Sequence, residues 1–410
     1  MQMEQEDGQG GDRPGPLAGI RVIDLTAVIF GPLATQILAD QGAEVIKIES
    51  PEGDMMRHVA PFRSPGMGAL FLAVNRNKKS VVLDLKSASG RAALFDLVAG
   101  ADVFVSSVRP KALARLGITP EALAAANPRL VTVALTGFGS GGPYADRPAF
   151  DDTVQAAAGA AALSAMVEPE QPPRYIPTII ADKIAGLTAA QAITAALLHR
   201  ERTGEGQHVE VPMFETLAAF LLAEHMAAAT FEERPENFGY ARVLDPHRRP
   251  VPTKDGHVTL LPYTNAQWRR FFEMTGRPEM VDHPWVNDLA ERSRHIGALY
   301  DMLVAMGPER TTTEWLAIAE AADIPAMPMN RLSDLPADPH LAQVGFFRRI
   351  DHPSEGPLWT TKPPVRFSRS PARADRLPPP ALGAHTEEVL ATLGRGPDGG
   401  EEAEGGEAGR

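Results

Sequence analysis

The chain has 410 residues, of which 44% are hydrophobic and 22% are charged, and its formal net charge is -12. This length is enough for one large and one smaller domain, and the composition is typical of a soluble globular protein. The acidic balance argues against nucleic-acid binding. The chain contains no cysteine, which excludes disulfides, thiolate metal sites and a cysteine nucleophile.

Both ends of the chain are rich in glycine and acidic residues. Residues 1–14 and 395–410 together carry half of the surplus negative charge. We expect them to be disordered tails, because such segments cannot bury enough apolar surface to fold. The first residues lack the basic and apolar regions of a signal peptide, and no uncharged apolar run has the length of about 18 residues that a membrane span needs. We therefore expect a cytoplasmic protein without a membrane span.

The first part of the chain alternates strand-like and helix-like patterns. Strands are predicted at 20–26, 44–49, 79–85, 102–107 and 129–137, and helices at 31–42, 89–101 and 119–127. Strands separated by helical segments are typical of parallel βαβ units. The expected fold is therefore α/β, with a large Rossmann-like open sheet.

Two longer helices are predicted next, at 151–166 and 183–201, and the composition then changes near residue 233. The segment after it is rich in proline, glycine and charge, which is typical of a linker. We predict a large α/β domain formed by residues 15–232 and 331–394. A smaller α+β domain is inserted between these parts, at 233–330.

The segment "GFGSGG" (137–142) has the glycine spacing of a dinucleotide-binding fingerprint and follows a predicted strand. A fingerprint must open a helix, and here Pro143 and a second proline at 148 follow, so we predict a flexible loop beside the site instead. Ser140 lacks the context of a hydrolase nucleophile, because Phe138 occupies the first glycine position. No pair of histidines has the spacing of a zinc site, so no metal is expected.

Basic residues gather around the predicted strand "NRNKKSVVLDLK" (75–86), and two more follow the next βα unit. They are Arg76, Lys78, Lys79 and Lys86, with Arg109 and Arg115 further along. One interpretation is a solvated basic edge that protects the sheet. The other is a phosphate-binding patch, because loops at strand ends line the ligand crevice of such sheets. The sequence alone leaves both open.

One carboxylate, Asp182 in "IIADKIAG", lies between an apolar run and the start of a long helix. It has two interpretations. A carboxylate there caps the free amides of the first turn. A helix N-terminus also stabilises an ionised carboxylate, the form that a covalent nucleophile requires. Asp151 and Asp152 similarly begin a helix, and capping is their default role.

Seven segments, in order, carry a family likeness from about Leu17 to Leu393. They are "LAGIRVIDLT", "GPLATQILADQGAEVIKIESPEGDMMR", "NRNKKSVVLDLK", "VRPKALARLGI", "NPRLVTVALTGFGSGGPYADRPAFD", "IIADKIAGLTAAQAITAALLHRERTGEGQHVEVPM" and "LGAHTEEVL". Together they resemble the class III CoA-transferases, the family of formyl-CoA and carnitine CoA-transferases. The resemblance implies that Asp182 attacks an acyl-CoA to form an aspartyl anhydride and then an aspartyl-CoA thioester. It also implies a homodimer of interlocked rings.

The resemblance implies which groups meet the substrates, an acyl-CoA and a small carboxylic acid, with no permanently bound cofactor. Leu83 to Lys86, Val108, Arg109 and Arg115 approach CoA, and Ile29 and Phe30 lie beside the thioester. Arg76 and Lys79 join the expected phosphate contacts as members of the basic cluster. Backbone amides of the glycine loop, at Gly139 and Gly141, are the expected oxyanion donors.

Some positions depart from the family pattern, and they bear on the alternatives. Ile29 stands where formyl-CoA transferases have Gln, which argues against formyl transfer, and with Phe30 it favours a larger or less polar acyl group. Ala27 and Ser107 also replace residues typical of the family. The same fold hosts α-methylacyl-CoA racemases, but Phe150 occupies the position of their proton-transferring histidine. A CoA-binding protein without catalysis is the third alternative. The sequence names neither acyl donor nor acceptor.

Overall fold

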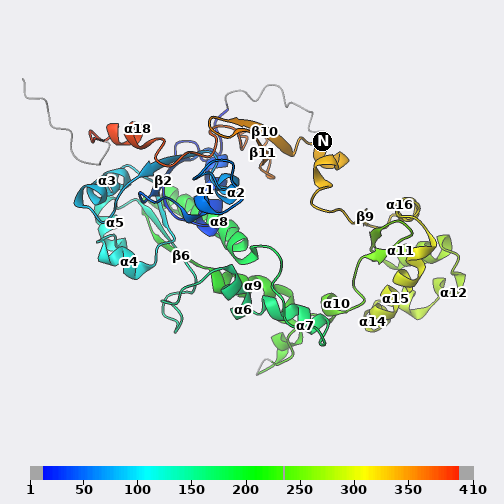
Figure 1. The fold of residues 1–410 in the computed structure, drawn as a ribbon. Coiled ribbons are helices and arrows are strands. Elements are labelled where there is room, and N and C mark those ends of the chain that lie inside the picture. Colours follow the sequence, from blue (N-terminus) through cyan, green and yellow to red (C-terminus); the bar gives the residue numbers. More distant parts are fainter. Residues whose placement is uncertain (1–12, 234–235, 397–410) are drawn as a thin grey trace, which may run out of the picture. The chain divides into compact units, whose positions relative to one another are not determined.

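The structure, a computed structural model, describes residues 13–233 and 236–396 (Figure 1). The predicted tails lie almost wholly outside these residues. The described chain forms two compact units. Unit 1 comprises residues 13–158, 176–220 and 342–396, and unit 2 comprises 159–175 and 221–341. In the described ranges, no helix has both the length and the hydropathy to cross a membrane.

Unit 1 is built on a six-stranded sheet of strand order β3-β2-β1-β4-β5-β6, in which every neighbouring pair is parallel. The strands are β1 (Arg21–Leu25), β2 (Glu44–Glu49), β3 (Lys78–Val82), β4 (Val103–Ser106), β5 (Val131–Thr136) and β6 (His208–Pro212). The predicted parallel α/β sheet is confirmed. Because the order reverses between β1 and β4, this fold places a ligand crevice beyond the carboxyl ends of those strands.

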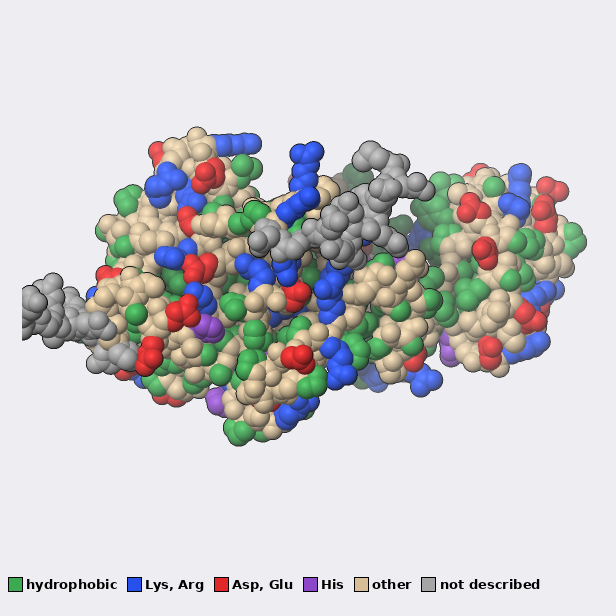
Figure 2. All heavy atoms as spheres, turned by 90° about the horizontal axis from the view of Figure 1, so that it is seen from above, with side chains coloured by type: hydrophobic (Ala, Val, Ile, Leu, Met, Phe, Trp, Pro, Cys, Tyr) green, Lys and Arg blue, Asp and Glu red, His purple; other side chains and the backbone are tan. Residues whose placement is uncertain are grey.

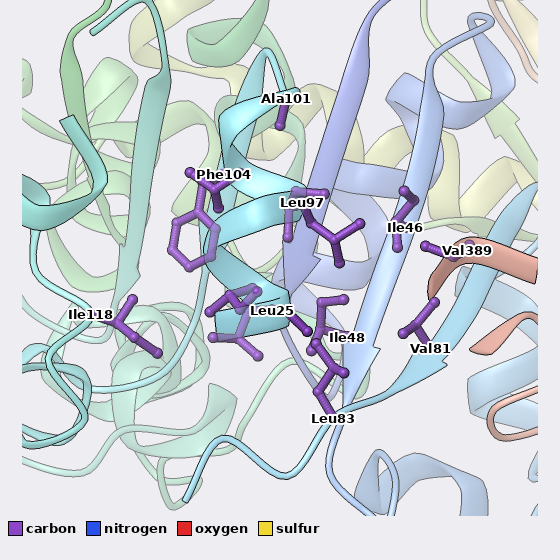
Figure 3. Close-up of a cluster of buried hydrophobic side chains, with 14 of the residues drawn as sticks. Leu25, Ile46, Ile48, Val81, Leu83, Leu97, Ala101, Phe104, Ile118 and Val389 are labelled. Carbon is purple, nitrogen blue, oxygen red and sulfur yellow. The ribbon is translucent and has the colours of Figure 1, made fainter. Parts of the chain in front are cut away.

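One face of the sheet is packed by apolar side chains. Figure 3 shows Leu25, Ile48 and Phe104 of the strands beside Leu97 of α3, with Val389 of α18 near Val81. The covering helices are α3 (Ala88–Ala99), α5 (Pro120–Ala126) and α18 (Thr386–Ala391). The C-terminal part of the described chain therefore packs on the same core as the first strands.

The opposite face is covered by α1 (Phe30–Asp40) and α8 (Ile180–Thr203). These helices approach closely, because Gly186 has no side chain: a Cβ there would lie 2.9 Å from the Phe30 carbonyl oxygen. This face is charged. Lys78 Nζ lies 3.1 Å from Asp24 Oδ2, and both side chains are fully buried.

The other described elements of unit 1 are short. They are η1 (Met55–His58), α2 (Ala69–Val74), α4 (Pro110–Arg115), α6 (Asp151–Ala157), and the antiparallel hairpin of β10 (Phe347–His352) and β11 (Gly356–Thr361). Helices α9 (Met213–His225) and α17 (Pro339–Gln343) span the unit boundaries. On the face shown in Figure 2, acidic and basic side chains are interspersed over much of each unit.

Unit 2 has a three-stranded antiparallel sheet of β7 (Val251–Pro252), β8 (His257–Leu260) and β9 (Ala326–Pro328). Its core is aromatic and contains Trp268, Phe271, Phe272 and Trp315. Its helices are η2 (Ala160–Ala162), α7 (Leu163–Val167), η3 (Ala227–Phe231), α10 (Ala241–Leu244), α11 (Asn265–Met274), α12 (Pro278–Val281), α13 (Pro284–Asn287), α14 (Leu289–Arg294), α15 (Ile296–Met306), η4 (Gly307–Glu309), α16 (Thr312–Ala321) and η5 (Leu335–Ala337).

Two features differ from the sequence prediction. The helix predicted at 151–166 is broken into α6 and α7, because Gly159 has φ +87 in the left-handed region, where a helix ends. Unit 2 includes residues 159–175 and resumes at Leu221, inside α9, whereas the predicted domain starts at 233. The predicted boundary follows a change in composition along the chain, whereas the observed unit is defined by contacts between residues.

Candidate active site

Asp182 lies in the first turn of α8, against the start of α1. Its Oδ1 accepts a hydrogen bond of 3.1 Å from the Phe30 backbone N–H. The side chain is buried, with 6% of the residue exposed. Since α1 follows β1, this contact brings the carboxylate to the carboxyl end of β1, the edge where the sheet reverses its strand order.

Asp182 does not cap its own helix. The N-cap of α8 is Ile179, which makes no side-chain cap bond. Asp151 supplies the acceptor instead: its Oδ1 receives the N–H groups of Ala181 (2.7 Å) and Asp182 (3.3 Å). The capping interpretation of Asp182 is therefore wrong, and Asp151 caps α8 although it belongs to α6. The Asp182 carboxylate is thus not committed to the amides of its own helix.

The surroundings of Asp182 disfavour its ionised form. Burial, and to a lesser extent the nearby Asp151 carboxylate, raise the pKa of this carboxyl to about 6, although the Phe30 N–H opposes both effects. Asp151 is itself fixed by a 2.6 Å hydrogen bond from Gln155 Nε2 to its Oδ2. A carboxylate with a strongly perturbed pKa, ionised at neutral pH and sparsely solvated, has the properties of a reactive group.

A cavity of about 360 Å³ opens at the same edge of the sheet. Its walls come from segments that follow the carboxyl ends of four strands, namely 25–27, 48–54, 83–86 and 107–108, with Leu116. Five residues expected to approach CoA line this cavity, namely Leu83 to Lys86 and Val108. Arg109 is adjacent in sequence to Val108, and Arg115 to Leu116; like Lys86, both arginines are exposed.

Ile29 and Phe30 lie at the start of α1, next to Asp182. They are 5% and 4% exposed, so their side chains belong to the core, and it is the Phe30 backbone that reaches Asp182. Their expected place beside the thioester, and the larger or less polar acyl group inferred from it, stay predictions.

The expected phosphate contacts at Arg76 and Lys79 are corrected by their positions. Arg76 is buried, with Nη2 2.7 Å from Asp40 Oδ2, so its charge is already paired inside the fold. Lys79, near the amino end of β3, pairs with Glu388 (2.8 Å) and Glu44 (3.2 Å). Because the amino and carboxyl ends of a parallel strand lie at opposite edges of the sheet, Lys79 lines a different cavity, with Arg21 and Arg376. The basic-edge interpretation suits Lys79.

The glycine loop also departs from its expected role. No helix follows it until α6 begins at Asp151, which confirms that it is no dinucleotide fingerprint. The Gly139 N–H donates to Glu215 Oε1 (2.9 Å), and Ser140 donates to Glu210. An amide engaged by a carboxylate is not available to an oxyanion, so Gly139 leaves the set of expected donors. Gly141, with φ +83 in the same exposed loop, stays a prediction.

Metal ligands do not gather at this site. Over residues 13–233 and 236–396, no group of three or more His, Cys, Asp or Glu side chains could hold an ion. The site combines a buried carboxylate, a helix N-terminus and a cavity edged by exposed cations. A buried carboxylate and a set of cations suit covalent acyl chemistry on a phosphate-bearing substrate.

Comparison with known proteins agrees with this chemistry. A family model described as CoA-transferase family III matches residues 17–386. The chain is 34% identical over 391 residues to the succinate–glutarate CoA-transferase of Agrobacterium fabrum, a match covering 93% of this chain and 96% of that protein. It is 31% identical to the human succinyl-CoA:glutarate CoA-transferase, over 92% of this chain and 85% of that protein.

Solved structures agree as well. The crystal structure of a CAIB/BAIF family protein from Brucella suis matches with a TM-score of 0.78 and 31% identity, over 93% of this chain and 100% of that chain. That of Rv3272 from M. tuberculosis matches with a TM-score of 0.79 and 31% identity, over 92% and 99%. The chain therefore belongs to CoA-transferase family III, as the resemblance predicted, and it transfers CoA between an acyl-CoA and a carboxylate.

Proposed function

We propose that Asp182 is the covalent nucleophile that carries CoA from the donor thioester to the acceptor acid. The observation that carries this proposal is the state of its carboxylate. It is buried, it has a pKa raised to about 6, and Asp151 has taken over the capping of its helix. Such a carboxylate is ionised near neutral pH and has little water to shed before it attacks a carbonyl.

The proposed reaction has four steps, each of which exchanges one acyl bond for another. Asp182 attacks the thioester carbonyl, the C–S bond breaks, and an aspartyl anhydride and CoA thiolate form. The thiolate attacks the aspartyl carbonyl, releasing the donor acid and leaving an aspartyl-CoA thioester. The acceptor carboxylate then displaces the thiolate to form a second anhydride. Attack of the thiolate on the acceptor carbonyl gives the new acyl-CoA and regenerates Asp182, so neither ATP nor a metal is consumed.

We propose that the acceptor acid is a dicarboxylic acid. The names of several relatives contain such acids: succinate and glutarate, succinyl-CoA and D-citramalate, succinyl-CoA and L-malate. A screen with succinyl-CoA as donor and labelled free acids, read by mass spectrometry, tests this. Glutarate should accept CoA and pentanoate, of the same chain length with one carboxylate, should not. Transfer to both acids at equal rates would contradict it.

We also propose a cytoplasmic homodimer of interlocked rings without a permanently bound cofactor. The resemblance implies the dimer, and large exposed side chains such as Phe150 and Trp359 in unit 1 support association. Light scattering of the purified protein should give twice the mass of one chain. The mass of a single chain would contradict the dimer.

The cavity at the carboxyl edge is proposed as the CoA site, with Lys86 and Arg115 on the phosphates. Lys86→Ala or Arg115→Ala should raise the KM for the CoA ester about ten- to a hundred-fold, with a smaller change in kcat, because a charge-assisted hydrogen bond contributes about 1.5–3 kcal/mol. Steady-state kinetics with varied acyl-CoA measure this. Lys79→Ala, at the opposite edge, is the matched control and should keep the wild-type KM. If Lys86→Ala and Arg115→Ala keep the wild-type KM, as the control does, neither residue belongs to the CoA site.

The racemase alternative requires a second proton-transferring group, which this chain lacks at the expected place. Phe150 precedes α6 and is 59% exposed. A phenyl ring cannot exchange a proton. Incubation with a chiral 2-methylacyl-CoA in deuterated water, without an acceptor acid, should therefore leave the α-position unlabelled in the mass spectrum. Rapid α-deuteration would show that the site performs racemase chemistry.

A further inference from the structure

The loop between β1 and α1 is held by side chains from other parts of unit 1. Three of its backbone N–H groups, and that of Phe30 at the start of α1, each donate to a side-chain oxygen. The bonds are Thr26 to Asp24 Oδ1 (3.0 Å), Ala27 to Ser107 Oγ (3.1 Å), Val28 to Asp54 Oδ1 (3.2 Å) and Phe30 to Asp182 Oδ1 (3.1 Å). Thr26 and Ala27 line the cavity at the carboxyl edge. The loop thus joins the wall of the proposed CoA site to the proposed nucleophile.

The backbone of this loop is strained at Val28. Its φ is +72, in the left-handed region. A β-branched residue is a genuine outlier there, because its side chain collides with the backbone, and such a conformation persists only where the surroundings enforce it. Strain of this kind gathers at functional sites, so the group that enforces it is of interest.

Asp54 is the group that holds Val28. Its Oδ1 accepts the Val28 N–H and the Met56 N–H (3.0 Å). Its Oδ2 lies 3.1 Å from Lys47 Nζ, and the side chains of this pair are 0% (Lys47) and 1% (Asp54) exposed. Lys47 Nζ also donates to the Thr26 carbonyl oxygen at 2.6 Å. The two charges therefore hold the loop on both sides of Ala27.

A buried ion pair adds little net stability, because the desolvation of both charges offsets their attraction. The Lys47–Asp54 pair is better explained by the geometry that it imposes. We propose that Asp54, supported by Lys47, is a positioning residue that holds the loop in its strained form and so keeps the Phe30 N–H on the Asp182 carboxylate. The inference rests on the proposed role of Asp182 as the nucleophile.

The consequence for Asp182 has two parts. First, the Phe30 N–H fixes the orientation of the carboxylate, and reactive groups lose rate steeply when they are misplaced. Second, this hydrogen bond favours the ionised form, against burial and the charge of Asp151 on α6, the carboxylate that acts on Asp182. If the loop relaxed, the attack would slow and Asp182 would take up a proton at higher pH.

The test is Asp54→Asn, which keeps the shape of the side chain, removes its charge and leaves a single acceptor oxygen that cannot hold both the Val28 N–H and Lys47. The rate of covalent loading of Asp182 is measured at saturating acyl-CoA by trapping with hydroxylamine and mass spectrometry, over pH 5–9. We expect the rate to fall about ten- to a hundred-fold and the acid limb of the pH–rate profile to move to higher pH. Asp40→Asn, which breaks the buried pair with Arg76 near the other end of α1, is the control. It should lower the melting temperature and leave the acid limb where it is.

A second substitution separates positioning from general damage. Glycine adopts a positive φ without strain, so Asp54→Asn combined with Val28→Gly should recover most of the loading rate and return the acid limb. Ser107→Ala releases only the Ala27 N–H and buries no charge, so it should shift the limb in the same direction by less. If Asp54→Asn does not fold, Ser107→Ala decides.

The outcomes are distinct. An acid limb that stays in place in Asp54→Asn, or in Ser107→Ala where the former is unfolded, overturns the positioning role. Absence of rescue by Val28→Gly overturns it too. If the wild-type protein forms no hydroxamate on Asp182, the nucleophile proposal itself fails. If the wild type forms it and the variants match its profile, only the inference about Asp54 fails.

Discussion

Asp182→Asn is expected to abolish CoA transfer while the variant remains folded. An amide cannot form the anhydride, so turnover should fall by at least about 10⁴-fold, the scale seen when a covalent nucleophile is removed. The amide oxygen can still accept the Phe30 N–H, and Asp151 still caps α8, so the local structure is preserved. Transfer activity, folding (by circular dichroism) and CoA binding are measured on one sample, and only the activity should be lost.

The same substitution should make the protein more stable at pH 8. The pKa of Asp182 is about 6 in the fold against 3.8 as its ordinary value, so above pH 6 its buried charge destabilises the folded state. Each pKa unit corresponds to about 1.4 kcal/mol, so the gain in Asp182→Asn is at most about 3 kcal/mol. Because the folded wild type takes up its proton first as the pH falls, the gain should shrink between pH 6 and about pH 4.

Calorimetric melting at pH 8 and pH 4 tests this sign. The wild-type rate of transfer should also fall about tenfold per pH unit below pH 6, as the nucleophile is protonated. Two results would count against the nucleophile. One is a folded Asp182→Asn variant with near-normal transfer. The other is a variant with a lower melting temperature than the wild type at pH 8, since the carboxylate would then stabilise the fold.

Lys78→Met is expected to lower the free energy of unfolding by about 3–5 kcal/mol, because it leaves Asp24 as an uncompensated buried charge. Lys78 Nζ lies 3.1 Å from Asp24 Oδ2 and donates to Asn75 Oδ1 (2.8 Å) and the Pro32 carbonyl (2.9 Å). Burial lowers the pKa of this lysine to about 8. Denaturant unfolding measures the loss.

The neighbouring lysine provides the control for Lys78. Lys79→Met removes a partly exposed pair and should cost under about 1 kcal/mol. The double variant Asp24→Asn/Lys78→Met should recover a large part of the loss, because no unpaired charge remains. Equal losses for Lys78→Met and Lys79→Met, or no recovery in the double variant, would show that the pair is not a buried ionic contact.

The different environments of Lys78 and Lys79 could not be predicted from the sequence. Adjacent residues on a strand point to opposite faces, so Lys78 is buried under α1 and Lys79 reaches the rim of the sheet. The sequence shows two identical cations in a row, and only the packing of a helix that begins 48 positions earlier separates them. Likewise, Arg76 pairs with Asp40, a partner that no local pattern reveals.

The regular elements of unit 1 were predictable for the opposite reason. Apolar strands and helices repeat at short range, and β1 to β5 and α8 lie close to their predicted ranges. The importance of Asp182 was also predictable from its place between an apolar run and a helix. That Asp151 caps α8 was not, because the bond joins two helices across 30 residues of sequence. The break of the helix at Gly159 was not predicted, because the apolar pattern continues through this position.

The single hydrogen bond between Phe30 and Asp182 makes the enzyme a reporter of its own chemical state. An amide proton resonance moves with the charge of its acceptor, and here the acceptor is the carboxylate that changes charge. In a ¹⁵N-labelled sample the Phe30 signal would follow the protonation of Asp182 near pH 6 without any added probe. It would shift again when that oxygen becomes part of an anhydride or a thioester. Nuclear magnetic resonance of one backbone position would then distinguish the free, acylated and CoA-loaded forms during turnover.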